Sequence, residues 1–358
     1  MMTTAAATKR PLIWCLEGPK AGDNAQLRAI TDALSGLRAF ELRTVPLDFA
    51  PQELLITLLL GVSTLGLTSS ARARLVRPWP DLVLTAGRRN EPVARWIQRE
   101  SMGRARLVHC GRPWANPLRY DLVVSTPQYY LDSQTYPNVL TLPLPPAPRR
   151  RATPDARQGP VLLLFGGESG NTQLGAAFAA ALVSRAAGLA RSRNRPLRIA
   201  TSPRTSTAAE AAIAQQAQAE HAEHYLWNAR AGAANPYANW ISSASAAVVT
   251  ADSMSMIADV AAIGLPVWIA KIPSSERPWW LTRRGWRWRS ATHELAQIVA
   301  PRRFRRDTLR LLDALVTSGR ALWLEDDIRA QAAINPDFGG ETDDAERAAA
   351  AVADLLPR

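Results

Sequence analysis

The segment 248–267 limits the possible folds of this chain more than any other. An apolar run ends at Thr250, a polar turn holds Asp252, Ser253 and Ser255, and an apolar helical pattern leads to a Gly-Leu-Pro turn and a second apolar run. A strand, a helix and another strand of this kind form a βαβ unit, which requires a parallel sheet. The polar turn is either an ordinary N-cap or a site for an anionic or sugar ligand, because helix N-termini present unpaired N–H groups.

Strands and helices alternate in two blocks of the chain, which predicts an α/β fold. In the first block we expect strands at 12–16, 82–85, 105–110, 122–125 and 139–142 and a helix at 24–37. In the second block we expect strands at 161–165, 197–201, 225–227 and 246–250 and helices at 172–189, 208–223 and 237–243. Continuous apolar strands between helices are typical of a parallel sheet that is covered on both faces.

The segment 143–160, rich in Pro and Arg, separates the two blocks and cannot continue a helix or a central strand. We therefore predict a Rossmann-like lobe at 1–146, a second one at 147–325, and a C-terminal tail at 326–358 that packs back across the lobes. A length of 358 residues suits two hydrophobic cores. The two parallel sheets are expected to face a central cleft.

The charge of the chain favours partners that carry phosphate. The formal net charge is +12, and all but three of the 43 basic residues are arginine. Nucleic acid, anionic lipid and nucleotide-activated substrates fit such a balance, while the base composition of the genome is an alternative cause of the arginine content. Cys15 and Cys110 lie in apolar runs and are expected to be small core residues in a reducing compartment.

Two segments bear on membrane contact. The apolar run 54–67 is shorter than the roughly 20 residues that span a bilayer, so we expect a buried or an interfacial helix. The segment 277–288 interleaves tryptophan with arginine, which is typical of a membrane surface contact, of base stacking or of cation–π packing at the edge of a core. The residues assigned to the membrane contact are Trp279, Trp280, Arg283, Arg284, Trp286 and Trp288. The polar segment 1–9 has no apolar core and does not resemble a signal peptide.

In each block, a glycine-containing loop follows the first strand. The loop 166–172 holds three glycines that let a backbone approach a ligand and whose N–H groups can bind an anion; the alternative is a generic tight turn. The loop 17–26 places Lys20 between two glycines and Asp23 at the start of a helix. Asp23 is either an N-cap or a catalytic base.

Three further loops each place an arginine after a strand. They are 86–89 with Arg88, 111–113 with Arg112, and 201–205 with Arg204. Open α/β sheets build their sites at the carboxyl ends of strands, so three such arginines suit an anionic substrate better than one would.

Several common catalytic signatures are missing from the sequence. The glycine loops match neither the Walker pattern nor the dinucleotide fingerprint, and no nucleophile elbow or kinase set is found. The four histidines have no metal-ligand spacing with cysteines or carboxylates, so we expect no metal site and no resident cofactor.

Six short motifs, in order along the chain, resemble the mitochondrial fission family named for an elongated-mitochondria phenotype in plants, in its bacterial branch. They are 18–26 (GPKAGDNAQ), 86–89 (AGRR), 111–113 (GRP), 201–205 (TSPRT), 235–237 (NPY) and 250–256 (TADSMSM). This family is similar to the GT-B glycosyltransferases. The resemblance implies two Rossmann-like lobes, with an acceptor in the first and a nucleotide-sugar donor in the second.

The resemblance implies a metal-independent GT-B glycosyltransferase, which we expect to be peripheral at the cytoplasmic face of the inner membrane. It would transfer a sugar from a nucleotide-sugar to a lipid-linked or envelope acceptor, with no nucleic-acid partner. Asp23 would be the base. Donor-binding residues would be Gly166, Gly167, Ser169, Gly170, Ser202, Arg204, Asp252, Ser253 and Ser255, and acceptor-binding residues Gly18, Lys20, Gly22, Asn24, Arg88 and Arg112. The alternative is a non-catalytic adaptor that recruits membrane-remodelling or division machinery to an anionic membrane surface.

Overall fold

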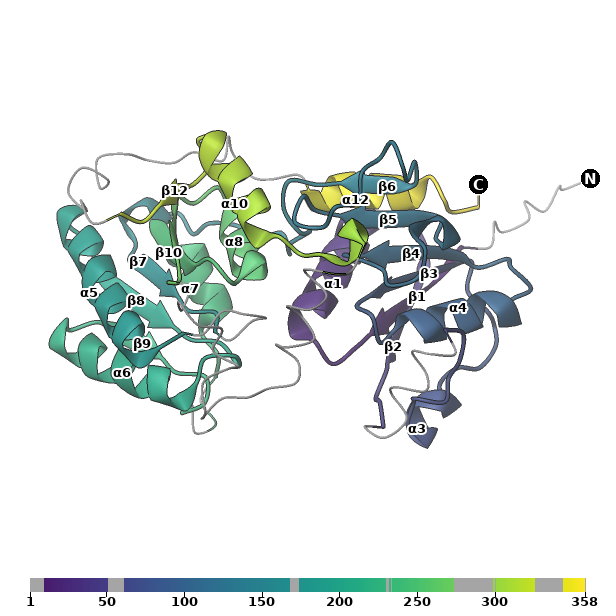
Figure 1. The fold of residues 1–358 in the computed structure, drawn as a ribbon, viewed down its shortest axis with the longest axis horizontal. Helices are drawn as coiled ribbons and strands as arrows, with labels where there is room; N and C mark the ends of the chain where they lie inside the picture. Colours follow the sequence, from purple (N-terminus) through teal and green to yellow (C-terminus); the bar gives the residue numbers. More distant parts are fainter. Residues whose placement is uncertain are drawn as a thin grey trace, which may run out of the picture. The chain divides into compact units, whose positions relative to one another are not determined.

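The computed structural model describes residues 10–50, 61–167, 174–229, 232, 234–273, 299, 301–325 and 344–357. The chain divides into two compact units (Figure 1). Unit 1 comprises Met1–Pro148 and Asp344–Arg358, and unit 2 comprises Arg149–Asp343. The boundary lies within the Pro- and Arg-rich segment 143–160, and the last residues of the chain return to unit 1.

Unit 1 contains a six-stranded sheet in which all strands are parallel. Its order is β2-β1-β3-β4-β5-β6, so the strand order reverses between β1 and β3. In open α/β sheets, ligands bind beyond the carboxyl ends of the strands at such a switch point. The strands are β1 (Leu12–Glu17), β2 (Glu41–Pro46), β3 (Leu82–Ala86), β4 (Arg106–Cys110), β5 (Leu122–Ser125) and β6 (Val139–Thr141).

Alternate strand residues of unit 1 face two separate cores, because successive side chains point to opposite faces of a sheet. Trp14 and Leu107 lie in the core that also contains residues of α3 (Ser69–Ala73) and α4 (Glu91–Glu100). Ile13 and Val108 lie in the core on the other face, with residues of α1 (Ala21–Ser35) and α12 (Asp344–Ala353).

Helix α12 is an integral part of unit 1. It packs against α1 and β5, and it buries Ala348, Ala349 and Val352 in the core beside α1. Arg38 donates from Nη1 to the carbonyl oxygens of Ala353 at 3.3 Å and Leu356 at 3.2 Å. The described part of the predicted tail therefore completes one face of the first sheet.

Unit 2 contains a second six-stranded parallel sheet, in the order β12-β11-β10-β7-β8-β9. Counted within the unit, this is the 3-2-1-4-5-6 order of the Rossmann fold, and the switch point lies between β7 and β10. The strands are β7 (Val161–Leu164), β8 (Leu197–Ala200), β9 (Glu223–Tyr225), β10 (Ala246–Thr250), β11 (Val267–Ala270) and β12 (Leu322–Trp323).

The helices of unit 2 cover its sheet. Phe165, Ile199 and Trp268 pack in one core with residues of α5 (Ala176–Ser192) and α6 (Thr207–Ala219). Within its described residues, unit 2 also contains the helices α7 (Tyr237–Ser243), α8 (Met254–Ala261) and α10 (Thr308–Thr317). Short 3₁₀ turns are η1 (Pro117–Arg119) in unit 1 and η2 (Ala156–Gln158) and η4 (Arg302–Phe304) in unit 2.

The predicted fold class is confirmed: the protein is α/β and GT-B-like in having two Rossmann-like lobes with parallel sheets. The cleft expected between the sheets stays a prediction. Strand β2 and helix α4 were not predicted, and α1 begins at Ala21, three positions before the expected start.

Both cysteines are free and buried, and burial raises the pKa of the Cys15 thiol to about 12. No helix within the described ranges is long and apolar enough to cross a membrane.

Candidate functional site

The turn after β7 has room only for glycine at two consecutive positions. A Cβ atom on Gly166 would lie 2.2 Å from Oδ2 of Asp252. Gly167 has a φ of +154°, and a Cβ atom there would lie 2.1 Å from the carbonyl oxygen of Arg204. Because any side chain would collide with these atoms, the turn brings its backbone directly against the loops that follow β8 and β10.

The carboxylate of Asp252 connects these three loops. Its Oδ1 accepts a hydrogen bond from the Thr250 hydroxyl at 2.7 Å, and its Oδ2 accepts one from the Gly167 N–H at 2.9 Å. Arg204 Nη1 lies 2.8 Å from the same Oδ2. The Asp252 side chain is fully buried, whereas 39% of the Arg204 side chain is exposed. Asp252 therefore fixes the glycine turn and Arg204 from beneath, and Arg204 is the charged member that reaches solvent.

Ser202 also holds the glycine turn through hydrogen bonds. The Ser202 and Thr205 hydroxyls both donate to the carbonyl oxygen of Gly166, the latter at 2.6 Å. Ser202 Oγ accepts from the Arg204 N–H at 3.2 Å. The structure thus brings together Gly166, Gly167, Ser202, Arg204 and Asp252 at the switch point of unit 2, with Ser202 in a structural position.

Helix α8 begins at this switch point without a side-chain cap. Ser253 is its N-cap residue, but the Ser253 side chain accepts no capping hydrogen bond. The Asp252 carboxylate accepts hydrogen bonds from Gly167 and Thr250 instead of capping the helix. Ser255 lies half-buried in the first turn. The polar turn therefore does not act as an ordinary side-chain cap. The N–H groups in the first turn of α8 are available to an anion.

A buried carboxylate that the sequence did not reveal supports the next loop. Glu210 of α6 accepts a hydrogen bond from the Thr201 hydroxyl at 2.5 Å and another from the Asn228 N–H at 3.1 Å. Thr201 Oγ1 in turn accepts from the Trp227 N–H at 2.8 Å. The Glu210 position carries no local signal, because its partners lie at the ends of β8 and β9.

Tyr237, from the 235–237 motif, has a structural contact. Its hydroxyl donates to Oδ2 of Asp259 at 2.8 Å, which joins α7 to α8. Burial raises the pKa of both side chains above their ordinary values, so the pair is held in an apolar setting.

In unit 1, two asparagines hold the turn that follows β1. Asn24 accepts from the Gly18 N–H at 3.0 Å and donates to the Gly18 carbonyl oxygen at 2.8 Å. Asn90 Nδ2 donates to the carbonyl oxygen of Leu16 at 3.1 Å, and a Cβ atom on Gly18 would lie 2.8 Å from Asn90 Oδ1. Asn24, predicted to bind the acceptor, is therefore occupied in shaping the loop.

Asp23 lies in the first turn of α1, at the switch point of unit 1. The N-cap residue is Lys20, with its Nζ 3.9 Å from Asp23 Oδ2, so Asp23 is not the cap that the sequence offered as an alternative. The Asp23 side chain is 30% exposed. Gly87, with a φ of +78°, gives its carboxylate room, because a Cβ atom there would lie 2.8 Å from Oδ2.

The other predicted acceptor residues lie in this turn or in the loops that follow β3 and β4. The Arg88 guanidinium lies 4.4 Å from the centre of the Trp114 ring, and that of Arg112 lies 5.4 Å from the Tyr129 ring. Both are held by cation–π contacts near the ends of β3 and β4. Lys20 is exposed, and Gly22 lies inside the first turn of α1.

A buried polar network beneath this turn was not predicted. Glu91, the first residue of α4, accepts hydrogen bonds from the N–H groups of Trp114 at 2.7 Å and Ala115 at 2.9 Å, and from the Tyr120 hydroxyl at 3.0 Å. His109 Nε2 lies 3.8 Å from Glu91 Oε1.

His109 is neutral in this setting, because complete burial lowers its pKa despite the nearby charges of Glu91 and Asp23. Burial beside Glu91 also raises the pKa of Tyr120 far above its ordinary value. In this network the buried Glu91 side chain is satisfied by three hydrogen bonds.

Some predicted residues lie outside the described ranges. These are Ser169 and Gly170 of the donor loop and the membrane-contact residues Trp279, Trp280, Arg283, Arg284, Trp286 and Trp288. In the part of the chain that the structure describes, no group of three or more His, Cys, Asp or Glu side chains is placed to hold a metal ion.

The model of the family described as mitochondrial fission ELM1 matches residues 21–353. The chain belongs to this family. The resemblance drawn from the six motifs is thereby confirmed for the ELM1 family. No curated protein is similar enough in sequence to count as a match.

Solved structures with a similar course of the chain were also found for this ELM1-family protein. UDP-GlcNAc 2-epimerase from Methanocaldococcus jannaschii is 10% identical, with 96% of this chain and 99% of that chain covered and a TM-score of 0.46. UGT2 of Phytolacca americana, solved with UDP-2fluoro-glucose and pterostilbene, is 11% identical, with 98% and 94% covered and a TM-score of 0.45. The MnaA–UDP structure from S. aureus is 10% identical, with 94% of both chains covered and a TM-score of 0.44.

Gly166→Ala and Gly167→Ala should each lower the free energy of unfolding by about 1–3 kcal/mol, because the added methyl group overlaps atoms of the neighbouring loops. Gly175→Ala is the matched control, since nothing lies within 4 Å of a Cβ atom there. Urea unfolding of the three variants measures the difference. Equal midpoints for all three would contradict the close packing of the turn.

The stability of unit 1 should fall as the pH drops below about 6.5, the ordinary pKa of histidine. The unfolded chain gains a proton on His109 there, whereas the folded chain, with a lowered pKa, does not. The resulting slope, at most about 1.4 kcal/mol per pH unit, should disappear in His109→Gln. Urea unfolding of the wild type and of His109→Gln between pH 5 and 7 tests this, and an equal slope in the two proteins would contradict the assignment to His109.

Proposed function

We propose that this ELM1-family protein is a glycosyltransferase-like enzyme that takes a nucleotide-sugar as donor. One observation carries the proposal: a Gly166-Gly167 turn is locked by Asp252 at the switch point of a Rossmann-like sheet, with Arg204 reaching solvent beside it. Rossmann-like sheets bind phosphate-linked nucleotides at this place. The donor would bind with its diphosphate toward Arg204 and the start of α8.

The leaving group of such a reaction is a nucleoside diphosphate. When the acceptor oxygen bonds to the anomeric carbon, the bond from that carbon to the diphosphate oxygen breaks, and negative charge builds up on the diphosphate. Arg204 and the uncapped N–H groups at the start of α8 are suited to stabilise that charge. Positive charge from these groups allows transfer without a metal ion.

The acceptor hydroxyl loses its proton in the same step, and we assign that proton to Asp23. Its carboxylate is partly exposed and lies in the glycine-lined turn of unit 1, as a general base requires. Lys20, Arg88 and Arg112 provide positive charge in the loops that follow β1, β3 and β4, which suits a phosphate-linked acceptor such as a lipid-linked one.

We also propose that the protein acts at the cytoplasmic face of the inner membrane. The support is the Trp- and Arg-rich segment 277–288, whose residue types suit a lipid headgroup region, and the net charge of +12.

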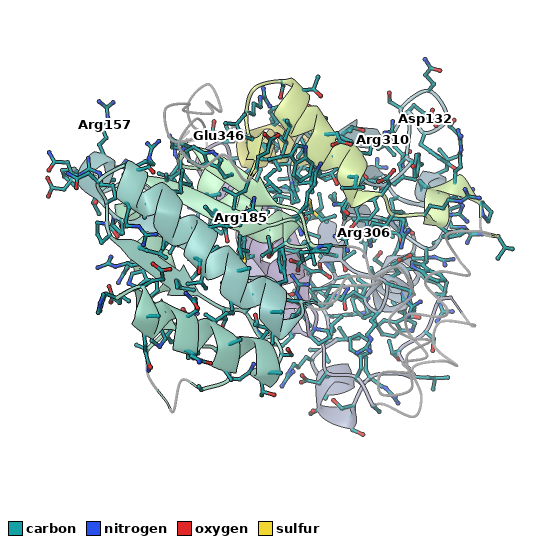
Figure 2. All side chains as sticks on the ribbon, turned by 60° about the vertical axis from the view of Figure 1, so that its left-hand side comes forward. Asp132, Arg157, Arg185, Arg306, Arg310 and Glu346 are labelled. Carbon is teal, nitrogen blue, oxygen red and sulfur yellow. The ribbon has the colours of Figure 1, made fainter. Side chains whose placement is uncertain are left out.

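Titration with uridine, guanosine, cytidine and thymidine diphosphates tests the donor site. At least one should bind saturably, and Arg204→Gln should weaken it by about tenfold or more, since a charge-assisted hydrogen bond contributes about 1.5–3 kcal/mol. Ser255→Trp should abolish binding by filling the site. The control is Arg157→Gln, because Arg157 projects into solvent from unit 2 (Figure 2). If no nucleotide binds, the non-catalytic adaptor becomes the better interpretation.

Asp23→Asn should keep the fold and donor binding but lower glycosyl transfer by about 10²–10⁴-fold, the usual contribution of a general base. Because Lys20 is the N-cap residue, the substitution removes no helix cap. The rate of sugar transfer from the donor identified by titration, with thermal unfolding alongside, measures both effects. Full transfer activity in Asp23→Asn would exclude Asp23 as the base.

A further inference from the structure

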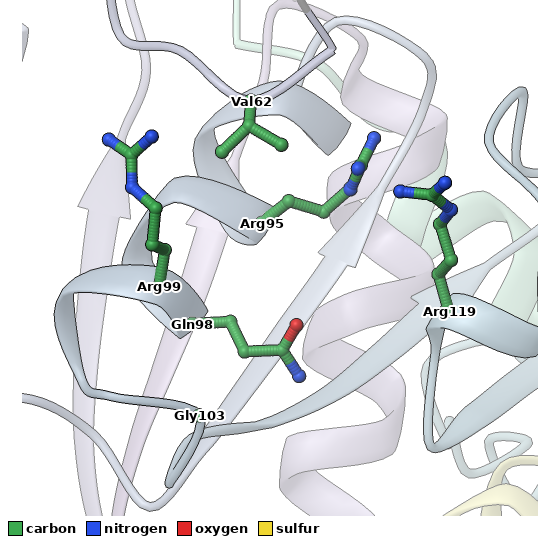
Figure 3. A pocket seen from close by; sticks show the side chains of 6 residues that line it. All are labelled: Val62, Arg95, Gln98, Arg99, Gly103 and Arg119. Atoms are coloured by element: carbon green, nitrogen blue, oxygen red, sulfur yellow. The ribbon is translucent and has the colours of Figure 1, made fainter.

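A second cationic site lies on unit 1, in a pocket of about 380 Å³ (Figure 3). Neither the sequence motifs nor the proposed reaction uses it. Three arginines and one glutamine supply its polar lining. The lining residues are Val62, Arg95, Gln98, Arg99, Gly103 and Arg119.

The pocket is at the opposite edge of the sheet from Asp23. Helix α4 starts after β3, at the carboxyl edge, and its 10 residues span about 15 Å toward the other edge. Gly103 precedes β4, and Arg119 precedes β5, so both lie where strands begin. A ligand in this pocket would therefore be separate from a substrate at the Asp23 turn.

Among the described residues that line it, three are cationic and none is a carboxylate. The Arg95 and Arg119 side chains extend toward each other from α4 and η1 (Figure 3). Arg95 is half-buried and donates from Nη1 to the carbonyl oxygen of Gly61 at 2.8 Å. Burial, together with the charge of Arg119, lowers the pKa of Arg95. Within the described residues, the Arg119 guanidinium forms no hydrogen bond or ion pair. A bound anion would relieve the repulsion between these two groups.

The donors in the pocket suit the oxygens of a phosphate group. Guanidinium groups bind phosphate through paired N–H groups, and the Gln98 amide adds a neutral donor from the same helix. The third arginine is partly occupied, because Arg99 Nη2 lies 3.3 Å from Glu100 Oε1. Arg119 is therefore the group most available to an anion, and Arg95, which has no carboxylate partner among the described residues, extends toward it.

Two exposed apolar residues that adjoin the lining residues in the chain indicate where the phosphate comes from. Met102 is 80% exposed and adjoins Gly103 in the chain, and Leu118 is 57% exposed and adjoins Arg119. Exposed apolar residues next to cationic lining residues suit a lipid, whose phosphate enters the pocket while its acyl chains meet these apolar side chains. We infer that the Arg95–Arg119 pocket binds the phosphate group of an anionic phospholipid.

Sedimentation of the full-length protein with vesicles tests this inference. Phosphatidylcholine vesicles with and without phosphatidylglycerol are compared for wild type and for Arg95→Gln/Arg119→Gln. The double variant should bind the anionic vesicles about thirtyfold more weakly, since each basic residue near an anionic surface contributes about fivefold. The control Arg151→Gln/Arg157→Gln removes the same charge from exposed positions of unit 2 and should bind like wild type. Equal weakening in both double variants would overturn the inference.

Two further measurements separate the sources of phosphate and guard against misfolding. Met102→Ser/Leu118→Ser leaves the arginines intact and should also weaken vesicle binding, while thermal unfolding shows that every variant is folded. Inorganic phosphate and glycerol phosphate should bind wild type much more weakly than the anionic vesicles do. If they bind tightly and only Arg95→Gln/Arg119→Gln loses them, with vesicle binding unchanged, the site takes soluble phosphate esters and the lipid assignment is wrong.

Discussion

The buried carboxylate of Asp252 is the interaction on which the geometry of unit 2 depends. It joins the ends of β7, β8 and β10 through the Gly167 N–H, Arg204 and Thr250. A fully buried charge is tolerated only when several donors satisfy it, and here each of its oxygens has at least one. Without this carboxylate, the Gly167 N–H and the Thr250 hydroxyl would lose their acceptor, and Arg204 would lose the contact that directs it. The partly exposed Arg204 of unit 2 is thus positioned by a residue that is itself buried.

In unit 1, mainly neutral groups hold the turn that follows the first strand. Asn24 and Asn90 hold the backbone around Gly18, and neutral His109 lies beneath the neighbouring loops. The buried carboxylate of this network belongs to Glu91, the first residue of α4. It accepts hydrogen bonds from two N–H groups and from the Tyr120 hydroxyl. As a result, the turn keeps an acidic group, Asp23, at its surface.

Those features that depend on local pattern could be predicted from the sequence, and those that depend on distant pairing could not. Apolar runs such as 161–165 and 246–250 gave strands, because buried parallel strands need apolar residues on both faces. Strand β2 is largely exposed and lacks that pattern. The Gly166–Asp252 contact joins residues 86 positions apart, so the sequence placed both at strand ends but could not show that the aspartate faces the glycine turn. The Arg95–Arg119 pocket has no motif for the same reason.

The contrast between the two aspartates decides which of them can take part in proton transfer. Asp252 has no exposed side-chain surface, and the Thr250 hydroxyl, the Gly167 N–H and Arg204 occupy its oxygens, so a group in solvent has no route to it. Asp23 is 30% exposed, and its nearest cation, Lys20 Nζ, is 3.9 Å away. Within the described residues no hydrogen bond occupies the Asp23 carboxylate. A base must be reachable by the group it deprotonates, so the accessible carboxylate of unit 1 is the one suited to receive a proton, while that of unit 2 holds Arg204 in place.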